Sequence, residues 1–414
     1  MNGTRCDVVV IGAGMVGATL ASLLCGGGFS VAMVEPRKPE AFSGEQDVGL
    51  RVSAISPGSA AVLNEAGVWR QTCAQRARPY RRMQVEDGSA GEPLVFDAPA
   101  HNLERLGTIV ENDLLQWTLW QHLEGHGEVE IHCPDAFAGI EKRANGNRVT
   151  LASGRAIDAG LVVAADGAAS MLRRAIGIGQ AHWSYNQHGL VAVVTKARAN
   201  PGVAWQRFLP GGPLAFLPLA DGRSSIVWTL PSREARGLLK AGDDEFIEQL
   251  DAASSGWLGS VTAAGPRAAF PLSMRLSEHY VQQGIVLVGD AAHVVHPLAG
   301  QGVNLGFADA AALTEILIRA RRAGDRIGSA RVLEKYDRWR RSESQLMSFG
   351  MHALHGLFSA DASRPLRRAG LALVRRSWFL RDQFVRRAAG LGPNAPSLAS
   401  GTRLKAMLLA SSAG

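Results

Sequence analysis

Three stretches of the chain, residues 7–35, 160–176 and 284–319, each join an apolar run to a glycine-containing turn and then to a helical pattern. In the first stretch, the β-branched run Asp7–Ile11 is typical of a buried parallel strand. A helical pattern over residues 18–24 and a second strand over residues 30–34 follow. Repetition of this unit predicts an α/β fold with a parallel sheet.

Apolar and polar residues alternate between the second and third of these stretches, over residues 189–195, 213–219 and 224–230. The turns that separate these segments are Asn200-Pro201-Gly202, Pro210-Gly211-Gly212 and Asp221-Gly222. This pattern predicts a smaller antiparallel or mixed sheet with hairpin connections, covering one side of the first domain. A helical tail is expected over residues 329–391. Residues 395–414 are rich in Ser, Ala and Gly, and we expect them to be frayed.

The composition fits two packed domains with a short appendage, because the chain has 414 residues of which 46% are apolar. Its four cysteines form no C-x-x-C pair and no zinc-ligand pattern, which favours a reduced compartment and predicts no metal site. The N-terminus does not resemble a signal peptide, and no apolar run reaches the roughly 18 residues of a membrane span. We therefore expect a cytoplasmic protein whose membrane contact, if it has one, is peripheral, on the inner face of the cell membrane.

Positive charge is concentrated near the C-terminus. The net charge is +7, and residues 364–387 hold eight arginines with Asp382 as their one acid. Apolar turns alternate with these arginines, as in a basic helix that lies on anionic lipid. A helix packed on protein with a solvated basic face gives the same pattern, and the sequence leaves both readings open. Aromatic residues are not interleaved as a stacking platform, so no nucleic-acid partner is expected.

The first chemical motif is Gly12-Ala13-Gly14-Met15-Val16-Gly17, which directly follows the first strand. Gly12 permits a tight turn, Gly14 lets the backbone approach a pyrophosphate, and Gly17 lets helix and strand pack closely. The helix N-terminus presents free N–H groups to the phosphates. Glu35 ends the second strand, where its carboxylate can accept hydrogen bonds from a ribose. The motif predicts a Rossmann-like dinucleotide site and does not distinguish NAD from FAD.

A later motif favours FAD. The strand of residues 284–289 ends at Asp290, at the carboxyl edge where ligands bind in open α/β sheets. A turn containing Gly300, Gly302, Val303 and Asn304 then opens into a helix. Asp290 can hold hydroxyls of a ribityl chain, and the helix start can stabilise negative charge on a flavin pyrimidine ring. A nicotinamide dinucleotide has no ribityl chain and does not need this second site.

At this point the chain resembles the flavin-dependent aromatic hydroxylases related to para-hydroxybenzoate hydroxylase, and within them most of all the ubiquinone-biosynthesis hydroxylases. The resemblance extends from about residue 7 to 391. The segments that carry it are Gly12–Gly17 with Glu35, Leu50–Ser56, Pro79–Met83, Ile109–Asn112, Ala165–Ser170, Gly289–Gly306 and Tyr336–Arg341. Ala169 departs from the asparagine that is common in the family, while Asp166, Ser170 and Arg173 keep the spacing.

The resemblance implies further cofactor contacts. Arg51 is expected to contact the flavin or its pyrophosphate, and Asp166-Gly167 to form a turn serving FAD and a nicotinamide donor. The residues alone also allow a surface arginine and an ordinary turn at these places. Arg37 completes the expected FAD-binding set.

The expected catalytic residues are His296 and Pro297. His296 and the backbone carbonyl of Pro297 would face the flavin edge. His296 could assist phenol deprotonation, or it could be a helix-entry histidine bonded to backbone. We expect His293 to be structural.

The implied function is an FAD-dependent monooxygenase that uses O₂ and NAD(P)H or another electron donor to hydroxylate a polyprenylated phenol in ubiquinone biosynthesis. Ile226–Trp228 and Gly302–Phe307 favour ring position C5 over C6 and C1. A flavoprotein prenyl reductase without oxygen insertion and a flavin-bound scaffold are the alternatives. Other ubiquinone-biosynthesis proteins are expected as partners. The candidate wall residues of an apolar substrate channel are Phe208, Phe216, Leu217, Trp228 and Phe270, although each could equally belong to the ordinary core.

We therefore expect a Rossmann-like FAD-binding domain, a smaller mixed β-sheet substrate domain and a helical C-terminal tail. The boundaries expected along the chain are 1–72, 101–176 and 276–345 for the FAD-binding domain, 73–100 and 177–275 for the substrate domain, and 346–414 for the basic helical region.

Overall fold

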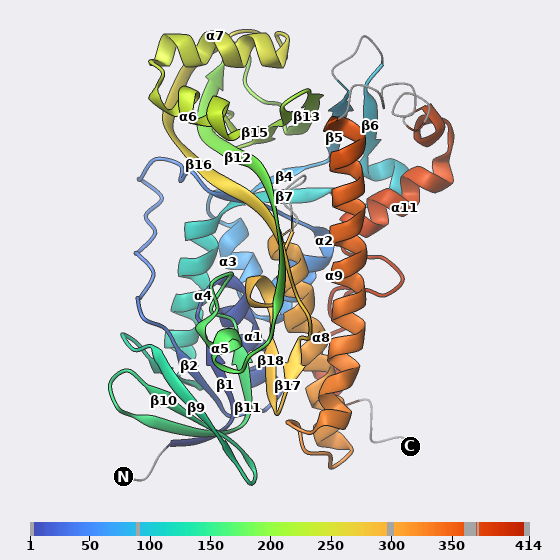
Figure 1. Cartoon of the computed structure of the whole chain (residues 1–414). Helices are drawn as coiled ribbons and strands as arrows, with labels where there is room; N and C mark the ends of the chain where they lie inside the picture. The colour runs from blue at the N-terminus through green and yellow to red at the C-terminus, as the bar shows by residue number, and fades with distance from the viewer. Residues whose placement is uncertain (1–3, 88–91, 296–301, 360–369, 371, 410–414) are drawn as a thin grey trace.

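Two large sheets occupy opposite ends of an elongated molecule, and one long helix runs along the side of both (Figure 1). This computed structural model describes residues 4–87, 92–295, 302–359, 370 and 372–409. The N-terminal strand lies in the lower sheet of Figure 1, and the helices α6 (Ser232–Lys240) and α7 (Asp243–Ser254) cover the upper sheet.

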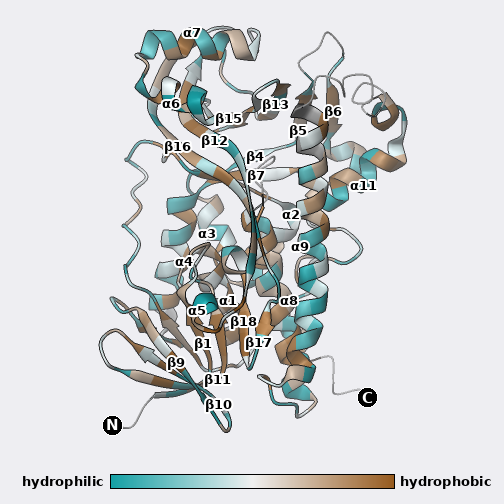
Figure 2. Ribbon diagram, in the orientation of Figure 1, coloured by the Kyte–Doolittle hydropathy of each residue, from teal (hydrophilic) through white to brown (hydrophobic). Residues whose placement is uncertain are grey.

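The lower sheet is mainly parallel, as the apolar runs predict. Its strand order is β17-β18-β11-β1-β2-β8, and only the pair β17–β18 on this path is antiparallel. The strands are β1 (Thr4–Ile11), β2 (Val31–Val34), β8 (Val129–His132), β11 (Ala156–Ala164), β17 (Val281–Gln282) and β18 (Ile285–Leu287), with the hairpin β9 (Phe137–Arg143) and β10 (Gly146–Leu151) joined to β11. The strands at its centre are strongly apolar (Figure 2) and buried, so helices cover both faces.

The helices of this domain follow the expected strand–turn–helix units. They are α1 (Met15–Gly26), α4 (Asn112–His126), α5 (Met171–Ala175) and α8 (Gly302–Arg322), with α2 (Pro57–Glu65) and α3 (Trp69–Cys73) beside them. Helix α1 packs against α4 and α8. The prediction of three such units is confirmed, because β1, β11 and β18 each precede a helix of this set along the chain.

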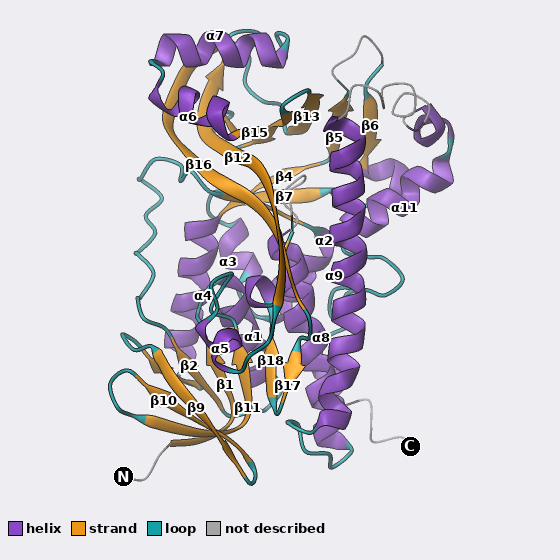
Figure 3. Cartoon of the chain, viewed as in Figure 1, coloured by secondary structure: helices purple, strands orange, loops and turns teal. Residues whose placement is uncertain are grey.

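The upper sheet has eight strands in the order β19-β16-β12-β15-β14-β13-β5-β6. Every neighbouring pair is antiparallel except β13–β5. The strands are β5 (Arg82–Glu86), β6 (Leu94–Asp97), β12 (Gln180–Lys196), β13 (Val203–Leu209), β14 (Gly212–Pro218), β15 (Ser224–Pro231), β16 (Val261–Ser277) and β19 (His293–Val294). Strands β12 and β16 run from the lower domain into the upper one (Figure 3). The predicted mixed sheet is confirmed.

A third sheet, in the order β3-β7-β4, lies between the two large ones. Its strands are β3 (Val52–Ile55), β4 (Arg78–Tyr80) and β7 (Gly107–Glu111), and the short helix η1 (Ala98–His101) precedes β7. The expected domain boundaries stay a prediction, although β5 and β6 do join the same sheet as the strands between residues 180 and 277.

The C-terminal region is helical, as predicted, and its last turns are packed. It contains α9 (Ala330–Ser359), α11 (Trp378–Ala388) and α12 (Leu404–Leu409). The expectation of frayed residues after 395 is wrong for those up to 409, because Leu398 and Leu404 are buried and their N–H groups bond to Glu315 and Glu65. Within the ranges given above, no helix is both long and apolar enough to cross a membrane.

A buried carboxylate joins three elements of the lower domain. Asp309 on α8 accepts hydrogen bonds from His293 Nε2 at 2.7 Å, from Arg340 Nε on α9 at 2.7 Å, and from the backbone N–H of Gly289 at 3.0 Å. All three side chains are almost completely buried. Burial by itself raises the pKa of Asp309, but the neighbouring His293 and Arg340 outweigh it and hold that pKa below its usual value. His293 is therefore structural, as expected.

Replacing this carboxylate tests its role. Asp309→Asn leaves Arg340 buried without a counter-charge, so we expect the free energy of unfolding at pH 7 to fall by about 3–5 kcal/mol. Because the folded-state pKa of Asp309 is lowered, its ionised form stabilises the fold above the unfolded value of about 3.9, and this contribution is lost as the pH falls through the folded-state pKa. Urea unfolding should therefore show a constant gap between wild type and variant near neutral pH and a smaller gap in acid.

Asp158→Asn is the matched control, because Asp158 pairs with Arg148 on the half-exposed hairpin side of the sheet. Its effect should be much smaller. Equal losses in the two variants, or a gap that widens in acid, would contradict the assignment.

Candidate cofactor and substrate site

A continuous cavity of about 890 Å³ lies where the three sheets meet. One end is lined by the turn after β1, by β3 and by the start of α8, and the other end by strands of the upper sheet. Residues of α9 and α11 line its rim. The volume is near the upper limit of the ~300–1,000 Å³ usual for ligand sites.

The glycine turn after β1 has two structural glycines and one that faces open space. Gly12 has a φ of +102°, and a Cβ there would lie 2.4 Å from the carbonyl oxygen of Ala165. A Cβ on Gly17 would lie 2.0 Å from the carbonyl oxygen of Gly12. A Cβ on Gly14 would meet no protein atom within 4 Å, although Gly14 lines the cavity at the N-terminus of α1. The space beside Gly14 fits a phosphate group held by free N–H groups.

Glu35 ends β2 beside this turn. Its carboxylate accepts hydrogen bonds from the N–H of Ala13 at 2.7 Å and from the N–H of Arg37 at 3.2 Å. A carboxylate has lone pairs for further donors, so these bonds leave room for ribose hydroxyls. The Arg37 side chain is exposed and does not line the cavity. Its place in the expected cofactor set therefore rests on the sequence alone.

The Asp166-Gly167 turn follows β11. Asp166 Oδ2 accepts from the N–H groups of Met171 and Leu172, so it caps α5, while its buried Oδ1 has no partner within the described chain. Gly167 has a φ of +78° and lines the cavity. Arg173 is buried and ties this turn to the carbonyl of Ala291. The predicted turn is present, and the Asp166 side chain stabilises it by capping α5. The contact of this turn with FAD and a nicotinamide donor stays a prediction.

Asp290 lies in the short helix η2 (Gly289–Ala291) after β18, and its side chain is open to the cavity. Protein surrounds it on its other sides. This burial raises the pKa of Asp290, against the opposing effects of His293, Arg51 and Arg275. A carboxylate set at a strand end in a deep cavity fits the hydroxyls of a ribityl chain.

Helix α8 starts at the cavity, where Gly302 and Val303 line the wall. The N-terminus of this 21-residue helix supports negative charge at that point. The Asn304 carboxamide accepts from the N–H of Ser56 and donates to the carbonyl of Ala54. These two bonds position β3 against α8. Asn304 does not line the cavity, and its contact with the cofactor stays a prediction.

Arg51 lines the cavity just before β3, with its guanidinium 5.0 Å from the centre of the Phe270 ring. It also lowers the pKa of Asp290, which places its charge at the cofactor end. The remaining expected residues, His296, Pro297 and Gly300, lie outside the described residues.

The substrate end is lined by one face of the upper sheet. Of the five expected wall residues, Phe208, Leu217 and Phe270 line the cavity. Phe216 and Trp228 instead pack on the opposite face, in the core under α6 and α7, so their assignment to the wall is wrong. Successive side chains of a strand point to opposite faces, and the parity along β14 and β15 decides which residue is wall and which is core.

Several lining residues were not identified from the sequence. Ser53 and Asn112 bond to each other at 2.7 Å, and Tyr80 is a buried phenol whose burial raises its pKa to about 12. Gln206 on β13 and Ser225 on β15 also line the cavity. The first three lie in segments that carry the family resemblance, so that resemblance was the available signal. For the last two the signal was the alternation of β13 and β15.

Comparison with known proteins agrees with this site. A family model described as an FAD binding domain matches residues 5–348. The 3-demethoxyubiquinol 3-hydroxylase of Escherichia coli (strain K12) is 38% identical, with 93% of this chain and 98% of that protein covered. Ubiquinone hydroxylase UbiL of Rhodospirillum rubrum is 36% identical, with coverages of 96% and 93%. The mitochondrial ubiquinone biosynthesis monooxygenase COQ6 of Homo sapiens is 33% identical, with 86% of each chain covered.

Solved structures show the same fold. PqsL, a probable FAD-dependent monooxygenase from Pseudomonas aeruginosa, gives a TM-score of 0.74 at 24% identity, over 89% of this chain and 99% of that one. The p-nitrophenol 4-monooxygenase PnpA from Pseudomonas putida gives 0.76 at 19% identity, over 95% and 100%.

The residues at the cofactor end fit FAD, since the open space at Gly14 and the carboxylate of Asp290 lie along one cavity. Full-length relatives at 33–38% identity extend the match beyond the cofactor domain. The chain therefore belongs to the FAD-dependent hydroxylases of ubiquinone biosynthesis, a family of aromatic-ring monooxygenases related to para-hydroxybenzoate hydroxylase.

Proposed function

We propose that this enzyme hydroxylates a polyprenylated phenol at ring position C5, using O₂ and NAD(P)H or another electron donor. The observation that carries the proposal is the division of the cavity. Among its described lining residues, only Arg51 and Asp290 are charged: Asp290 lies at the cofactor end, and Arg51 lies near it and against Phe270 of β16. The upper-sheet end is apolar with a few neutral polar groups, which suits an uncharged ring with a hydrocarbon tail.

FAD, when bound, supplies the electron transfer and oxygen activation that amino-acid side chains cannot supply. The protein must place the ring beside it and keep water away. Gly14, Asp290 and the start of α8 would hold the cofactor. Aliphatic side chains of the upper sheet, such as Val191 and Val227, would exclude water from the ring.

The cofactor cradle can be tested at Gly14. Its φ of −62° and ψ of 174° suit any residue, and its Cβ position is free of protein atoms, so Gly14→Val should fold normally. The valine side chain would occupy the space for the pyrophosphate, and we expect FAD affinity to fall by about tenfold or more, at least ~1.4 kcal/mol. Titration of the apoprotein with FAD, followed by absorbance near the flavin band, measures this.

Gly237→Val is the control, because Gly237 lies exposed on α6 with no atom within 4 Å of its Cβ position. Its FAD affinity should equal that of the wild type. Wild-type affinity in Gly14→Val would show that the pyrophosphate does not lie at this turn.

The reaction and its position can be tested together. Deletion of the gene should abolish ubiquinone and cause accumulation of a precursor that lacks the C5 hydroxyl. The purified enzyme should consume O₂ in step with formation of the hydroxylated ring. Accumulation of a precursor that lacks a different hydroxyl would replace C5 by that position. A product with a saturated prenyl bond and no O₂ uptake would indicate a reductase, and flavin-bound protein without turnover would indicate a scaffold.

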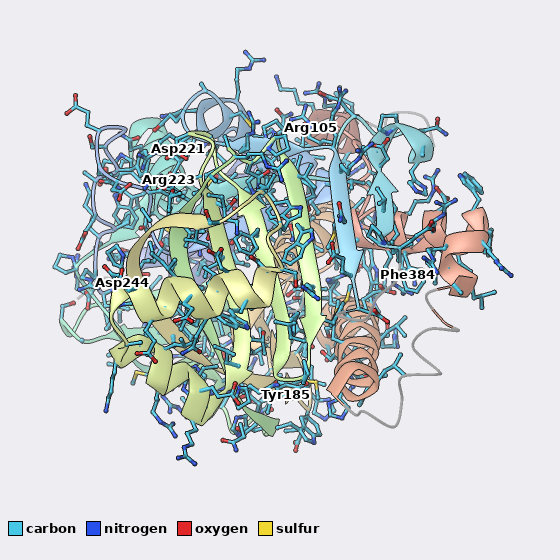
Figure 4. The ribbon with its side chains drawn as sticks, turned by 90° about the horizontal axis from the view of Figure 1, so that it is seen from above. Arg105, Tyr185, Asp221, Arg223, Asp244 and Phe384 are labelled. Carbon is cyan, nitrogen blue, oxygen red and sulfur yellow. The ribbon has the colours of Figure 1, made fainter. Side chains whose placement is uncertain are left out.

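The partner proposed for the C-terminal surface is an anionic lipid bilayer. In α11, apolar and polar residues intermingle (Figure 2), and Trp378, Phe379 and Phe384 are 53%, 63% and 53% exposed. Five arginines between residues 370 and 390 accompany them. Phe384 also lines the cavity rim, and Figure 4 places it on α11 beside the upper sheet. Exposed aromatic and basic residues at the cavity rim suit an enzyme that takes its substrate from a bilayer.

Flotation with vesicles tests this surface. The variant Leu373→Ser/Phe379→Ser removes two exposed apolar side chains, and we expect binding to vesicles containing anionic lipid to fall by about tenfold. Met171→Ser is the control, because Met171 is 56% exposed on α5, away from the rim. Equal flotation of both variants would contradict a lipid partner at this surface and favour a protein partner. Equal binding to neutral and anionic vesicles would contradict the role of the arginines and the preference for anionic lipid.

A further inference from the structure

Gln206, near the middle of β13, is a polar side chain without a protein partner. The residue is only 5% exposed and lines the cavity. Throughout the portion of the chain that the structure describes, no hydrogen bond joins its carboxamide to another residue. A buried carboxamide with unmade hydrogen bonds is costly, and such groups in folded proteins are usually satisfied by a partner, water or a ligand.

The sheet register places this carboxamide in an apolar row. Gln206 lies opposite Ala215 on one side and Val85 on the other. The row continues through Val227, Val191 and Leu94, and all of these residues line the cavity. Residues directly opposite one another on neighbouring strands share a face. The Gln206 side chain therefore points into the cavity from the middle of a hydrocarbon surface (the strands are seen from above in Figure 4).

The flanking residues of β13 show that this orientation is selective. Trp205 Nε1 donates to Glu86 at 2.8 Å, and Trp205 packs in the core beneath α7. On the neighbouring strand, Gln84 donates to the same Glu86 at 2.9 Å. Trp205, Gln84 and Glu86 on the outer face thus bond to one another. The Gln206 carboxamide on the inner face has no hydrogen-bond partner among the described residues, so a molecule in the cavity can supply one.

We propose that the Gln206 carboxamide binds an oxygen substituent of the phenolic ring and thereby fixes which ring carbon faces the cofactor. This deepens the proposed function and rests on it. Oε1 accepts a hydrogen bond from a phenol O–H, and Nε2 donates to a hydroxyl or methoxy oxygen. A group that hydrogen-bonds the substrate discriminates strongly against an analogue that leaves it unpaired.

The same geometry defines the substrate class as uncharged at this end of the ring. A carboxylate bound beside Gln206 would be buried without a cation from the described lining residues, because Arg51, the one cation among them, lies against Phe270 on β16, four strands away from β13 in the sheet order. A second neutral group supports this reading, since Ser225 Oγ on β15 is buried at the cavity without a partner. The ring bound by Gln206 therefore carries hydroxyl or methoxy groups and no carboxylate.

The test compares Gln206→Met with the wild-type holoenzyme, because methionine has a similar length and makes no comparable hydrogen bond. The probes are a short-chain prenylphenol, its methyl ether and its ring-carboxylated analogue. Wild type should bind the phenol best and the carboxylate least. In Gln206→Met we expect phenol binding to weaken by about three- to tenfold, with the preference over the ether largely lost. The share of O₂ that appears as hydroxylated product should fall, and a second ring position should be hydroxylated.

Gln84→Met makes the same change on the outer face and should leave affinity and product unchanged. Gln206→Asn keeps the carboxamide on a shorter stem and should recover part of the preference. FAD content and melting temperature identify any variant that has lost its fold. If Gln206→Met does not fold, the phenol preference and product position of Gln206→Asn test the inference instead. Unchanged phenol preference and product position in Gln206→Met would overturn the inference while the proposed function stands. Failure of the wild type to bind any prenylphenol would overturn both.

Discussion

The carboxylate of Asp309 is the point on which the geometry of the site depends. It fixes the N–H of Gly289 at the end of β18, so the next side chain, Asp290, is turned into the cavity. Through Arg340 it binds α9 to α8. Through His293 it reaches β19, which pairs with β16 of the upper sheet. One buried charge therefore links the cavity edge of the parallel sheet to the upper sheet that lines the other end of the cavity. Its ionised state survives burial because two cationic or hydrogen-bonding partners surround it.

Close packing of backbone against neighbouring residues also shapes the cofactor end. A Cβ on Gly306 would lie 2.5 Å from Val16, so α8 can begin beside α1 only because this residue has no side chain. The N-termini of both helices then open on one cavity, an arrangement that fits a single anionic ligand. Asn304 closes the arrangement by holding β3 against α8. The described lining of the cofactor end therefore consists largely of backbone and helix ends, with few charged side chains.

The sequence predicted what depends on local pattern. The glycine turn, the strand ending at Asp290 and the alternating strands of the substrate domain are local, and the structure has them where expected. Contacts between distant residues were not predictable in the same way. The two hydrogen-bond partners of the Asn304 side chain, for example, lie about 250 positions earlier in the chain. Residues 395–414 were expected to be frayed because they are rich in Ser, Ala and Gly, yet Glu315 and Glu65 bond to the backbone of Leu398 and Leu404.

The alternation of side chains along a strand explains why Phe216 is not part of the cavity wall. Phe216 and Leu217 are neighbours, and the sequence left wall and core open for both. On a strand they must face opposite ways, and Phe216 belongs with the tryptophans beneath α7. A one-residue change of register would exchange the two faces. The alternation that places Phe216 in the core beneath α7 also places Gln206 on the face that lines the cavity. The register that fills the core therefore also determines which polar side chain lines the cavity.

The proposed substrate must be bound tightly and its ring must be oriented, and different parts of the cavity suit these two requirements. Affinity for a substrate with a long hydrocarbon tail can come from apolar area alone, because each buried CH₂ contributes ~0.8 kcal/mol wherever it lies along the rim. Such contacts do not orient a ring, since apolar burial is non-directional. Orientation needs a hydrogen bond, and on the sheet face that requirement falls on a few neutral groups among aliphatic side chains. The enzyme should therefore accept prenyl tails of different lengths but discriminate strongly between ring substitution patterns. Different surfaces of one cavity determine the affinity for the tail and the orientation of the ring.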